Sequence, residues 1–171
     1  ALLESSLVLL NANENLKVHG IKASKISFDL NQMHERKNGI VSTMSKGVAG
    51  LFKLNKIDVI QGQAYVADEH TLQIISESDD SNITAENIIL ASGSKPIELP
   101  GLPFDEKLLL SSNGALRIEE VPNRVAVIGA GAVGLELGSV WSRLGSEVTI
   151  CEALTEFLPN ADDAVSKEAL K

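Results

Sequence analysis

Val125-Ala-Val-Ile-Gly129-Ala-Gly131-Ala-Val-Gly134-Leu-Glu-Leu-Gly138 is the most informative run of this sequence. It combines an apolar strand, a glycine turn and the first turns of a helix, and a second apolar strand follows. This order, with Gly-x-Gly-x-x-Gly at the first turn, is the fingerprint of a dinucleotide-binding β–α–β unit. The sequence therefore predicts an α/β fold of the Rossmann-like type, with a strand at Arg124–Ile128, a helix at Ala132–Leu144 and a strand at Glu147–Cys151.

The glycines of this run have separate physical roles. Gly129 allows a tight turn, and Gly131 lacks the side chain that would block a pyrophosphate. Gly134 and Gly138 lie four positions apart, which allows the helix to approach the sheet closely. The start of the helix directs free N–H groups and a positive dipole end at an anion. Gly145 is expected to end the helix in the left-handed conformation.

Two acidic residues accompany the turn. Glu152 ends the second strand, close to the roughly 20-residue spacing expected for the acid that binds a ribose. Its carboxylate can accept hydrogen bonds from both adenosine ribose hydroxyls and would repel a 2′-phosphate, so the site favours NAD over NADP. Glu136 lies in the first turns of the helix, where an acid is favourable with or without a ligand.

Composition excludes several classes of protein. The 171 residues are 44% hydrophobic and 22% charged, as in a globular protein, and the net charge of −8 disfavours binding to nucleic acid. The apolar runs are too short to span a membrane. A single cysteine cannot form an internal disulfide or a thiolate zinc site, and the three scattered histidines predict no metal site.

Two further side chains of the predicted unit are expected to be structural. We expect Cys151 to be a buried, inert thiol within its strand, and Trp141 to be a packing residue. The apolar face of the predicted helix combines Val133, Leu137, Val140 and Leu144.

The rest of the chain divides at a segment rich in proline and glycine, between about residues 94 and 114. Before it, apolar periodicity predicts two helices, then an antiparallel meander and a last strand buried on both faces. Both ends lie within helical patterns, which favours an internal segment of a longer protein. The expected elements are helix 1–10, polar turn 11–20, a helix from Ile26 to Phe52 capped by Ser27 or Asp29, strands Ile57–Ile60, Gln63–Val66 and Thr71–Ile75, turn Glu77–Asp80, strand Ala85–Leu90, loop Ser92–Pro103, turn Ser111–Gly114 and helix 161–171.

Several motifs in this order resemble the dihydrolipoamide dehydrogenases, within the two-dinucleotide-binding disulfide oxidoreductases. The resemblance covers nearly the whole chain. It is carried by Ala1-Leu-Leu-Glu-Ser-Ser, Leu51-Phe-Lys-Leu-Asn-Lys56, Ile88-Ile-Leu-Ala-Ser-Gly-Ser94, Ser111-Ser-Asn-Gly-Ala-Leu116, the glycine run through Trp141, and Leu144-Gly-Ser-Glu-Val-Thr-Ile-Cys-Glu152.

The resemblance implies a fold with two dinucleotide-binding domains, present here in part, and it implies roles for individual residues. Residues 1–113 would be the later part of an FAD-binding domain, and residues 114–171 would begin an NAD-binding domain. Ser92 stands where the family's second flavin motif has threonine, so a hydroxyl is kept. The implied FAD contacts are Ala64, Ser92, Gly93 and Ser94, and the implied NAD contacts are Gly129, Ala130, Gly131, Ala132, Val133, Gly134, Glu136 near the nicotinamide and Glu152 on the ribose.

The family's redox-active cysteine pair and its His–Glu base match no residues of this chain, and Cys151 is not at a redox position. The resemblance therefore implies no catalytic residue within the segment. For the parent it implies oxidation of protein-bound dihydrolipoamide through FAD to NAD+, a role in cell redox homeostasis and a homodimer. The implied partners are lipoyl-bearing proteins of 2-oxo acid dehydrogenase and glycine cleavage complexes.

Other assignments stay open at this point. Mercuric reductase and soluble transhydrogenase are alternatives, whereas an NADP-using relative such as glutathione reductase would carry a basic residue at or near Glu152. A non-catalytic nucleotide-sensing module is the alternative from another class, and the flavin-type loop Ala91–Ser94 disfavours it. Bacterial cytoplasm and mitochondrial matrix are both open as locations.

Overall fold

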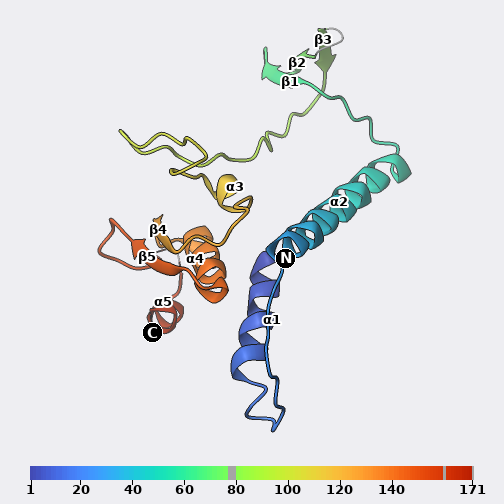
Figure 1. Ribbon diagram of the computed structural model, residues 1–171. Helices are drawn as coiled ribbons and strands as arrows, with labels where there is room; N and C mark the ends of the chain where they lie inside the picture. Colours follow the sequence, from blue (N-terminus) through green and yellow to red (C-terminus); the bar gives the residue numbers. More distant parts are fainter. Residues whose placement is uncertain (77–79, 160, 171) are drawn as a thin grey trace. The chain divides into compact units, whose positions relative to one another are not determined.

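The computed structural model describes residues 1–76, 80–159 and 161–170, and these residues form two compact units (Figure 1). The first unit combines Ala1–Ser42 with Pro96–Lys171, and the second is Thr43–Lys95. The assignment of residues 1–113 to the later part of an FAD-binding domain and of residues 114–171 to the beginning of an NAD-binding domain stays a prediction. The elements are α1 (Leu2–Glu14), α2 (Leu30–Leu54), β1 (Gln63–Val66), β2 (Thr71–Ile75), β3 (Ser81–Thr84), α3 (Ser112–Ala115), β4 (Arg124–Ile128), α4 (Ala132–Leu144), β5 (Glu147–Cys151) and α5 (Asp163–Ala169).

The predicted β–α–β unit is confirmed with the expected bounds. β4 and β5 pair in parallel from Arg124 opposite Glu147 to Ile128 opposite Cys151, and α4 packs against both strands (Figure 1). Gly145 follows α4 with φ of 112°, the left-handed conformation predicted for it. The parallel pairing brings the carboxyl ends of both strands to one edge, next to the start of α4.

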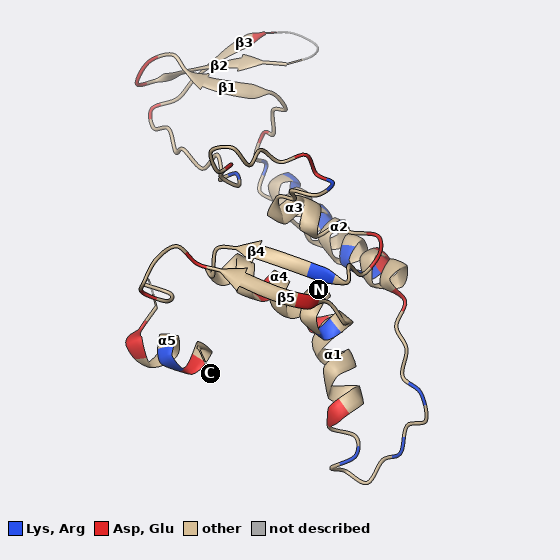
Figure 2. Ribbon diagram, turned by 60° about the vertical axis from the view of Figure 1, so that its left-hand side comes forward, with Lys and Arg blue, Asp and Glu red and all other residues tan. Residues whose placement is uncertain are grey.

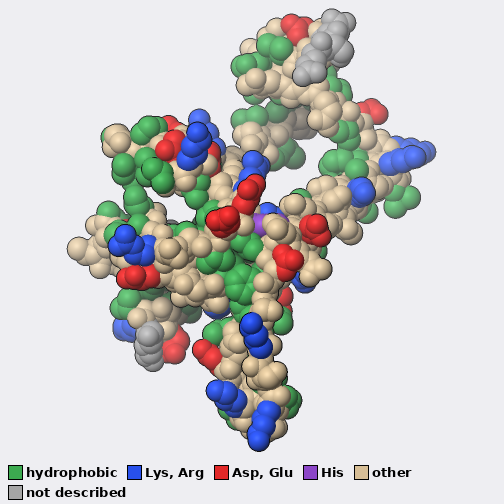
Figure 3. All heavy atoms as spheres, viewed as in Figure 1, with side chains coloured by type: hydrophobic (Ala, Val, Ile, Leu, Met, Phe, Trp, Pro, Cys, Tyr) green, Lys and Arg blue, Asp and Glu red, His purple; other side chains and the backbone are tan. Residues whose placement is uncertain are grey.

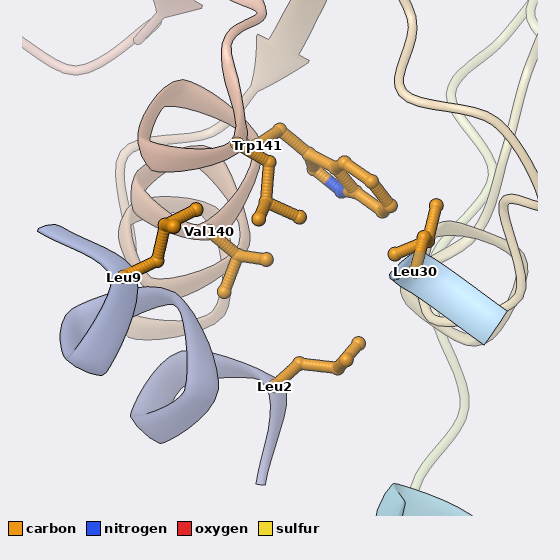
Figure 4. Close-up of a cluster of buried hydrophobic side chains, with 6 residues drawn as sticks. Leu2, Leu9, Leu30, Val140 and Trp141 are labelled. Carbon is orange, nitrogen blue, oxygen red and sulfur yellow. The ribbon is translucent and has the colours of Figure 1, made fainter. Parts of the chain in front are cut away.

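The core of the first unit lies between α4, α1 and the start of α2 (Figure 4). Trp141 is 1% exposed, and its indole ring points toward Leu30, which confirms its predicted packing role (Figure 4). Val140 and Leu9 lie beside one another between α4 and α1 (Figure 4). The cluster is formed by Leu2, Leu9, Leu30, Val140, Trp141 and Leu144.

The predicted apolar face of α4 is wrong in one position. Val133 is 58% exposed, and the buried residues of α4 are Gly138, Val140, Trp141 and Leu144. Gly138 lies in the middle of the helix and faces Ile150 of β5, and the other three lie in the second half, where α1 and Leu30 cover the helix. Val133 lies in the first turn, so the apolar periodicity of α4 extends beyond the surface that its neighbours bury.

The first two helices differ from the prediction at their ends. α1 continues to Glu14, four residues into the expected polar turn, and the Asn15 side-chain amide donates to Asn11 Oδ1 over 3.0 Å. α2 begins at Leu30 rather than Ile26, because the Asp29 carboxylate accepts the Gln32 N–H over 3.1 Å and so caps the helix. Of the two predicted caps, the structure thus selects Asp29.

Two side chains connect the start of α2 to the segment before β4. His34 Nε2 lies 2.8 Å from the Ile118 carbonyl oxygen, and Lys37 Nζ lies 2.5 Å from that of Leu116. Since a carbonyl only accepts, His34 must donate from Nε2, and its Nδ1 accepts from Lys37 Nζ at 3.2 Å. Burial lowers the pKa of Lys37, and the charge of Arg117 lowers it further.

The second unit contains the predicted antiparallel meander, with two changes. β1 and β2 have the expected bounds, but the third strand is Ser81–Thr84 and not Ala85–Leu90. Neither Ile57–Ile60 nor Ala85–Leu90 forms a strand, and Ile89 is 89% exposed rather than buried on both faces. An apolar run becomes a strand only where a partner strand forms hydrogen bonds with its backbone N–H and C=O groups. Most of the expected turn Glu77–Asp80 lies outside the described residues.

The connecting segments agree largely with the prediction. Ser92–Pro103 is irregular, with a turn closed by the Leu99–Leu102 bridge. The expected turn at Ser111–Gly114 is instead the start of the short helix α3, because the Ser111 hydroxyl accepts the Gly114 N–H. The last helix is confirmed as α5, which is capped by Asp162 and carries both acidic and basic positions (Figure 2); Lys171 lies outside the described residues.

The surface carries many hydrophobic side chains (Figure 3). Val48, Leu51, Leu90 and Leu108 are among those at least half exposed. Within the described part of the chain, no helix is both long and apolar enough to cross a bilayer, and no group of three metal-ligating side chains gathers.

Candidate dinucleotide site

The glycine turn Gly129–Gly131 connects the end of β4 to the start of α4 (Figure 1). Gly129 has φ of 101°, a conformation that side chains with a Cβ rarely adopt. Its N–H donates to the Cys151 carbonyl over 2.8 Å, which attaches the turn to the end of β5. The predicted role of Gly129 in a tight turn is therefore confirmed.

Three further glycines are required to different degrees. A Cβ on Gly134 would lie 2.1 Å from the Gly129 carbonyl oxygen, so the helix could not approach the turn with any larger residue. A Cβ on Gly138 would lie 3.4 Å from Ile150 Cδ1, an ordinary contact. A Cβ on Gly131 would meet nothing within 4 Å. The protein itself therefore demands glycine at position 134, and leaves open space beside position 131.

The start of α4 is open to an anion. Gly131 precedes the helix without a side-chain hydrogen bond to it, whereas Asp162 caps α5 through the Ala164 N–H. The first N–H groups of a helix have no partner within the helix, and the dipole adds partial positive charge there. An uncapped helix start that faces a glycine turn is suited to a phosphate group.

Glu152 lies immediately beyond β5 and contacts the glycine turn. Its Oε2 accepts the Ala130 N–H over 2.7 Å, and its Oε1 accepts the Leu154 N–H over 2.9 Å. The Leu154 hydrogen bond, followed by that from Ala130, holds the pKa of this carboxyl below its usual value. The side chain is exposed, so the ionised carboxylate is accessible to a ligand.

The structure brings the predicted residues of the glycine turn and Glu152 together at one edge of the β4–β5 pair. Ala130 is buried, whereas Ala132 and Val133 are exposed in the first turn of α4. Glu136 is exposed further along the same helix. Contact of these residues with NAD remains a prediction.

The predicted flavin contacts all lie in the second unit. Ala64 is an exposed residue of β1, opposite Ile74 of β2. Ser92, Gly93 and Ser94 form an exposed segment in which Gly93 has φ of 78°. This backbone conformation explains the glycine, but contact with FAD remains a prediction.

Two features of the site differ from the sequence analysis or were missed by it. Cys151 is exposed rather than buried, because β5 pairs only with β4 among the described residues and α4 covers one face. The hydrogen bond from Ala130 to Glu152 was not predicted. The position of Glu152 was the signal for it. Cys151, the last residue of β5, pairs with Ile128, which directly precedes the glycine turn. Glu152 follows Cys151 and so lies beside the turn.

Comparisons with known proteins agree on one family. A family model described as "Pyridine nucleotide-disulphide oxidoreductase" matches residues 3–171. The chain is 42% identical over 171 residues to a dihydrolipoyl dehydrogenase of Cupriavidus necator, covering 100% of this chain and 36% of the relative. It is 39% identical over 169 residues to the mitochondrial dihydrolipoyl dehydrogenase of Pisum sativum, covering 98% and 34%. It is 41% identical over 169 residues to a leghemoglobin reductase of Vigna unguiculata, covering 98% and 32%. The chain thus spans about a third of the length of these relatives.

Solved structures show the same fold. LpdA from Mycobacterium tuberculosis matches with a TM-score of 0.85 at 20% identity, over 98% of this chain and 37% of that one. The flavoprotein disulfide reductase RclA from Escherichia coli, in its Cu(II) complex, matches with a TM-score of 0.70 at 25% identity, over 99% and 36%. Both alignments include residues of both compact units.

Proposed function

Because this chain belongs to the pyridine nucleotide-disulphide oxidoreductase family, we propose that it forms part of a dihydrolipoyl dehydrogenase that uses FAD and NAD. The observation that carries the proposal is the uncapped start of α4 behind a glycine turn, with the Glu152 carboxylate beside it. The name shared by the relatives from Cupriavidus necator and Pisum sativum supports the choice within the family.

The residues of the first unit fit a nicotinamide dinucleotide. The open space beside Gly131 would admit a pyrophosphate, and the first N–H groups of α4 would donate to it. The remaining residues that would line NAD are Gly129, Ala130, Ala132, Val133, Gly134 and Glu136.

Glu152 would determine which nicotinamide cofactor is used. Two of the roughly four lone-pair positions of its carboxylate accept the Ala130 and Leu154 N–H groups, which leaves acceptors for the ribose hydroxyls. A 2′-phosphate in the same place would meet a negative charge. We therefore expect NAD rather than NADP.

The second unit would contribute to the flavin site. Ala64 offers exposed backbone at β1, and the Ser92–Ser94 segment offers two hydroxyls beside a glycine in the left-handed conformation. These groups suit polar parts of FAD. The chain itself would hold and orient both cofactors and limit access of water to them.

When bound, the cofactors would supply the redox chemistry: dihydrolipoamide is oxidised to lipoamide, and the two electrons pass through FAD to NAD+. The chain has one cysteine, Cys151, so a disulfide that exchanges electrons with dihydrolipoamide would come from elsewhere in the whole protein. The protein would act as a homodimer on lipoyl-bearing proteins of 2-oxo acid dehydrogenase and glycine cleavage complexes. We place it in the bacterial cytoplasm, with the mitochondrial matrix as the second candidate.

The experiment is steady-state kinetics of the full-length protein with dihydrolipoamide as donor and either NAD+ or NADP+ as acceptor. We expect turnover with NAD+ and a kcat/KM for NADP+ lower by about tenfold or more, as expected from loss of one hydrogen bond to a charged group. Equal efficiency with both cofactors would contradict the role of Glu152.

A second set of assays separates the alternatives. Turnover with Hg2+ but not with dihydrolipoamide would favour a mercuric reductase, and hydride exchange between NADH and NADP+ would favour a transhydrogenase. Binding of NAD without turnover of any of these substrates would favour a nucleotide-sensing module.

A further inference from the structure

The Glu152 carboxylate joins two backbone segments that no strand pairing connects. Oε2 accepts from Ala130, within the glycine turn, and Oε1 accepts from Leu154, in the segment that leaves β5. Gly129, one residue earlier, is already attached to β5 through its N–H and the Cys151 carbonyl at 2.8 Å. The turn is therefore held at two successive N–H groups, one by backbone and one by a side chain.

From this geometry we infer that Glu152 is a positioning residue for the glycine turn, in addition to the ribose contact proposed above, on which this inference builds. A Cβ on Gly129 or on Gly131 would meet no neighbour within 4 Å, so neither position offers a side chain that could restrain the turn against the end of β5. The two hydrogen bonds that Glu152 accepts, from Ala130 and Leu154, form what we call the Glu152 bridge. This bridge supplies that restraint before any dinucleotide binds. The turn is then already shaped for a pyrophosphate, which lowers the entropic cost of binding.

Only an ionised carboxylate of this length can hold both backbone segments and also bind the ribose hydroxyls. The two oxygens each accept one backbone N–H and still retain lone pairs for ribose hydroxyls. A glutamine has one acceptor oxygen and one NH2 donor, so one of the two N–H groups would face a donor. A basic or small residue, of the kind that would suit a 2′-phosphate, would leave both N–H groups without this acceptor. Substitution of Glu152 alone would therefore weaken NAD binding without creating a good NADP site.

The test uses the full-length flavoprotein and its Glu152→Gln and Glu152→Ala variants, with Glu147→Gln as the matched control. Glu147 is an exposed acid at the opposite end of β5. Amide hydrogen exchange is followed by mass spectrometry without dinucleotide, in peptides that cover Val127–Val133 and Cys151–Glu156. Flavin absorbance equal to that of the unaltered protein selects the variants that are folded.

We expect Glu152→Ala to accelerate exchange in both peptides by about tenfold or more, the factor expected from loss of a hydrogen bond to a charged group. Glu152→Gln should accelerate exchange in one of the two, and Glu147→Gln in neither. In steady-state kinetics the KM for NAD+ should rise more than kcat falls, because the loss is in binding. Unchanged exchange in both peptides for both Glu152 variants would overturn the inference, even if NAD binding were weakened.

These readouts also separate this inference from the proposed function. If the unaltered protein bound no NAD, the proposed function would fail, while accelerated exchange would still support the positioning role. If NAD bound normally and the exchange were unaltered by either substitution, the ribose contact would stand and the positioning role would not.

Discussion

Gly134 approaches Gly129 so closely that a Cβ on Gly134 would stand 2.1 Å from the Gly129 carbonyl oxygen. A Cβ atom comes this close to a backbone oxygen only if the backbone moves. The start of α4 and the glycine turn are thus packed directly on one another, and this contact defines the shape of the candidate dinucleotide site.

Gly134→Ala should therefore disturb both stability and binding. The overlap forces the turn and α4 apart, at a cost of about 1–3 kcal/mol, the usual range for overpacking. We expect a lower thermal midpoint and weakened NADH binding in the full-length protein, measured by calorimetry and by fluorescence titration. Gly138→Ala is the control, because its Cβ would make only ordinary contacts and alanine favours the helix. An unchanged midpoint for Gly134→Ala would contradict the close packing.

Gly131→Val separates binding from folding. Gly131 has φ of −74° and a Cβ there would meet no protein atom within 4 Å, so the fold should tolerate the substitution. A dinucleotide pyrophosphate would meet the added side chain. We expect retained flavin absorbance together with loss of NADH binding. Loss of flavin instead would mean that the glycine turn serves FAD.

Acid should release the Glu152 bridge. The pKa of Glu152 is lower in the folded protein because the Leu154 and Ala130 N–H groups donate to its ionised form. The bridge therefore stabilises the fold fully above the ordinary glutamate pKa, less as the pH falls below that value, and no longer once the pH is below the lowered pKa. Glu152→Gln should melt earlier than the unaltered protein at neutral pH, and this difference should shrink as the pH falls.

Thermal midpoints at a series of pH values measure this effect, with Glu147→Gln expected to follow the unaltered protein throughout. If the thermal midpoint of Glu152→Gln stayed below that of the unaltered protein by a constant amount into the acid range, the charge of the carboxylate would not be the source of the stabilisation.

The 171 residues expressed alone should associate and have no dihydrolipoamide dehydrogenase activity. One cysteine cannot form an internal redox disulfide, so electrons from dihydrolipoamide have no acceptor within the chain. Large apolar side chains such as Leu90, Ile97 and Leu108 are at least three-quarters exposed, and such surfaces drive association. Size-exclusion chromatography with light scattering and a turnover assay measure both expectations. A monomer with a sharp thermal transition would contradict the first.

The parts of the fold that local sequence determines were predicted well. The bounds of β4, α4 and β5 follow from apolar runs separated by glycines whose conformations are now visible, as at Gly129 and Gly145. The bounds of β1 and β2 were also predicted, from short β-type runs separated by the polar stretch 67–70. Strands at Ile57–Ile60 and Ala85–Leu90 were wrong, because an apolar run specifies a strand only together with a partner, and partners are a property of the fold.

The candidate site was predicted in position but not in detail. The order of glycines places Gly129–Gly134 and Glu152 at one strand edge, because a parallel β–α–β unit has only one way to bring these ends together. The hydrogen bond between Ala130 and Glu152 depends on a side-chain rotamer and on the path of the chain after β5. The residue order indicates that Glu152 lies beside the turn, but it specifies neither this rotamer nor this path.

The burial of Trp141 gives the first unit a built-in optical probe. It is the sole tryptophan of the 171 residues, and it lies on the helix that begins at the glycine turn. Its indole N–H has no acceptor among the described residues, and its side chain belongs to the same buried cluster as Leu2 and Leu30. Its emission therefore reports directly on whether α4 keeps its contacts with α1 and the start of α2.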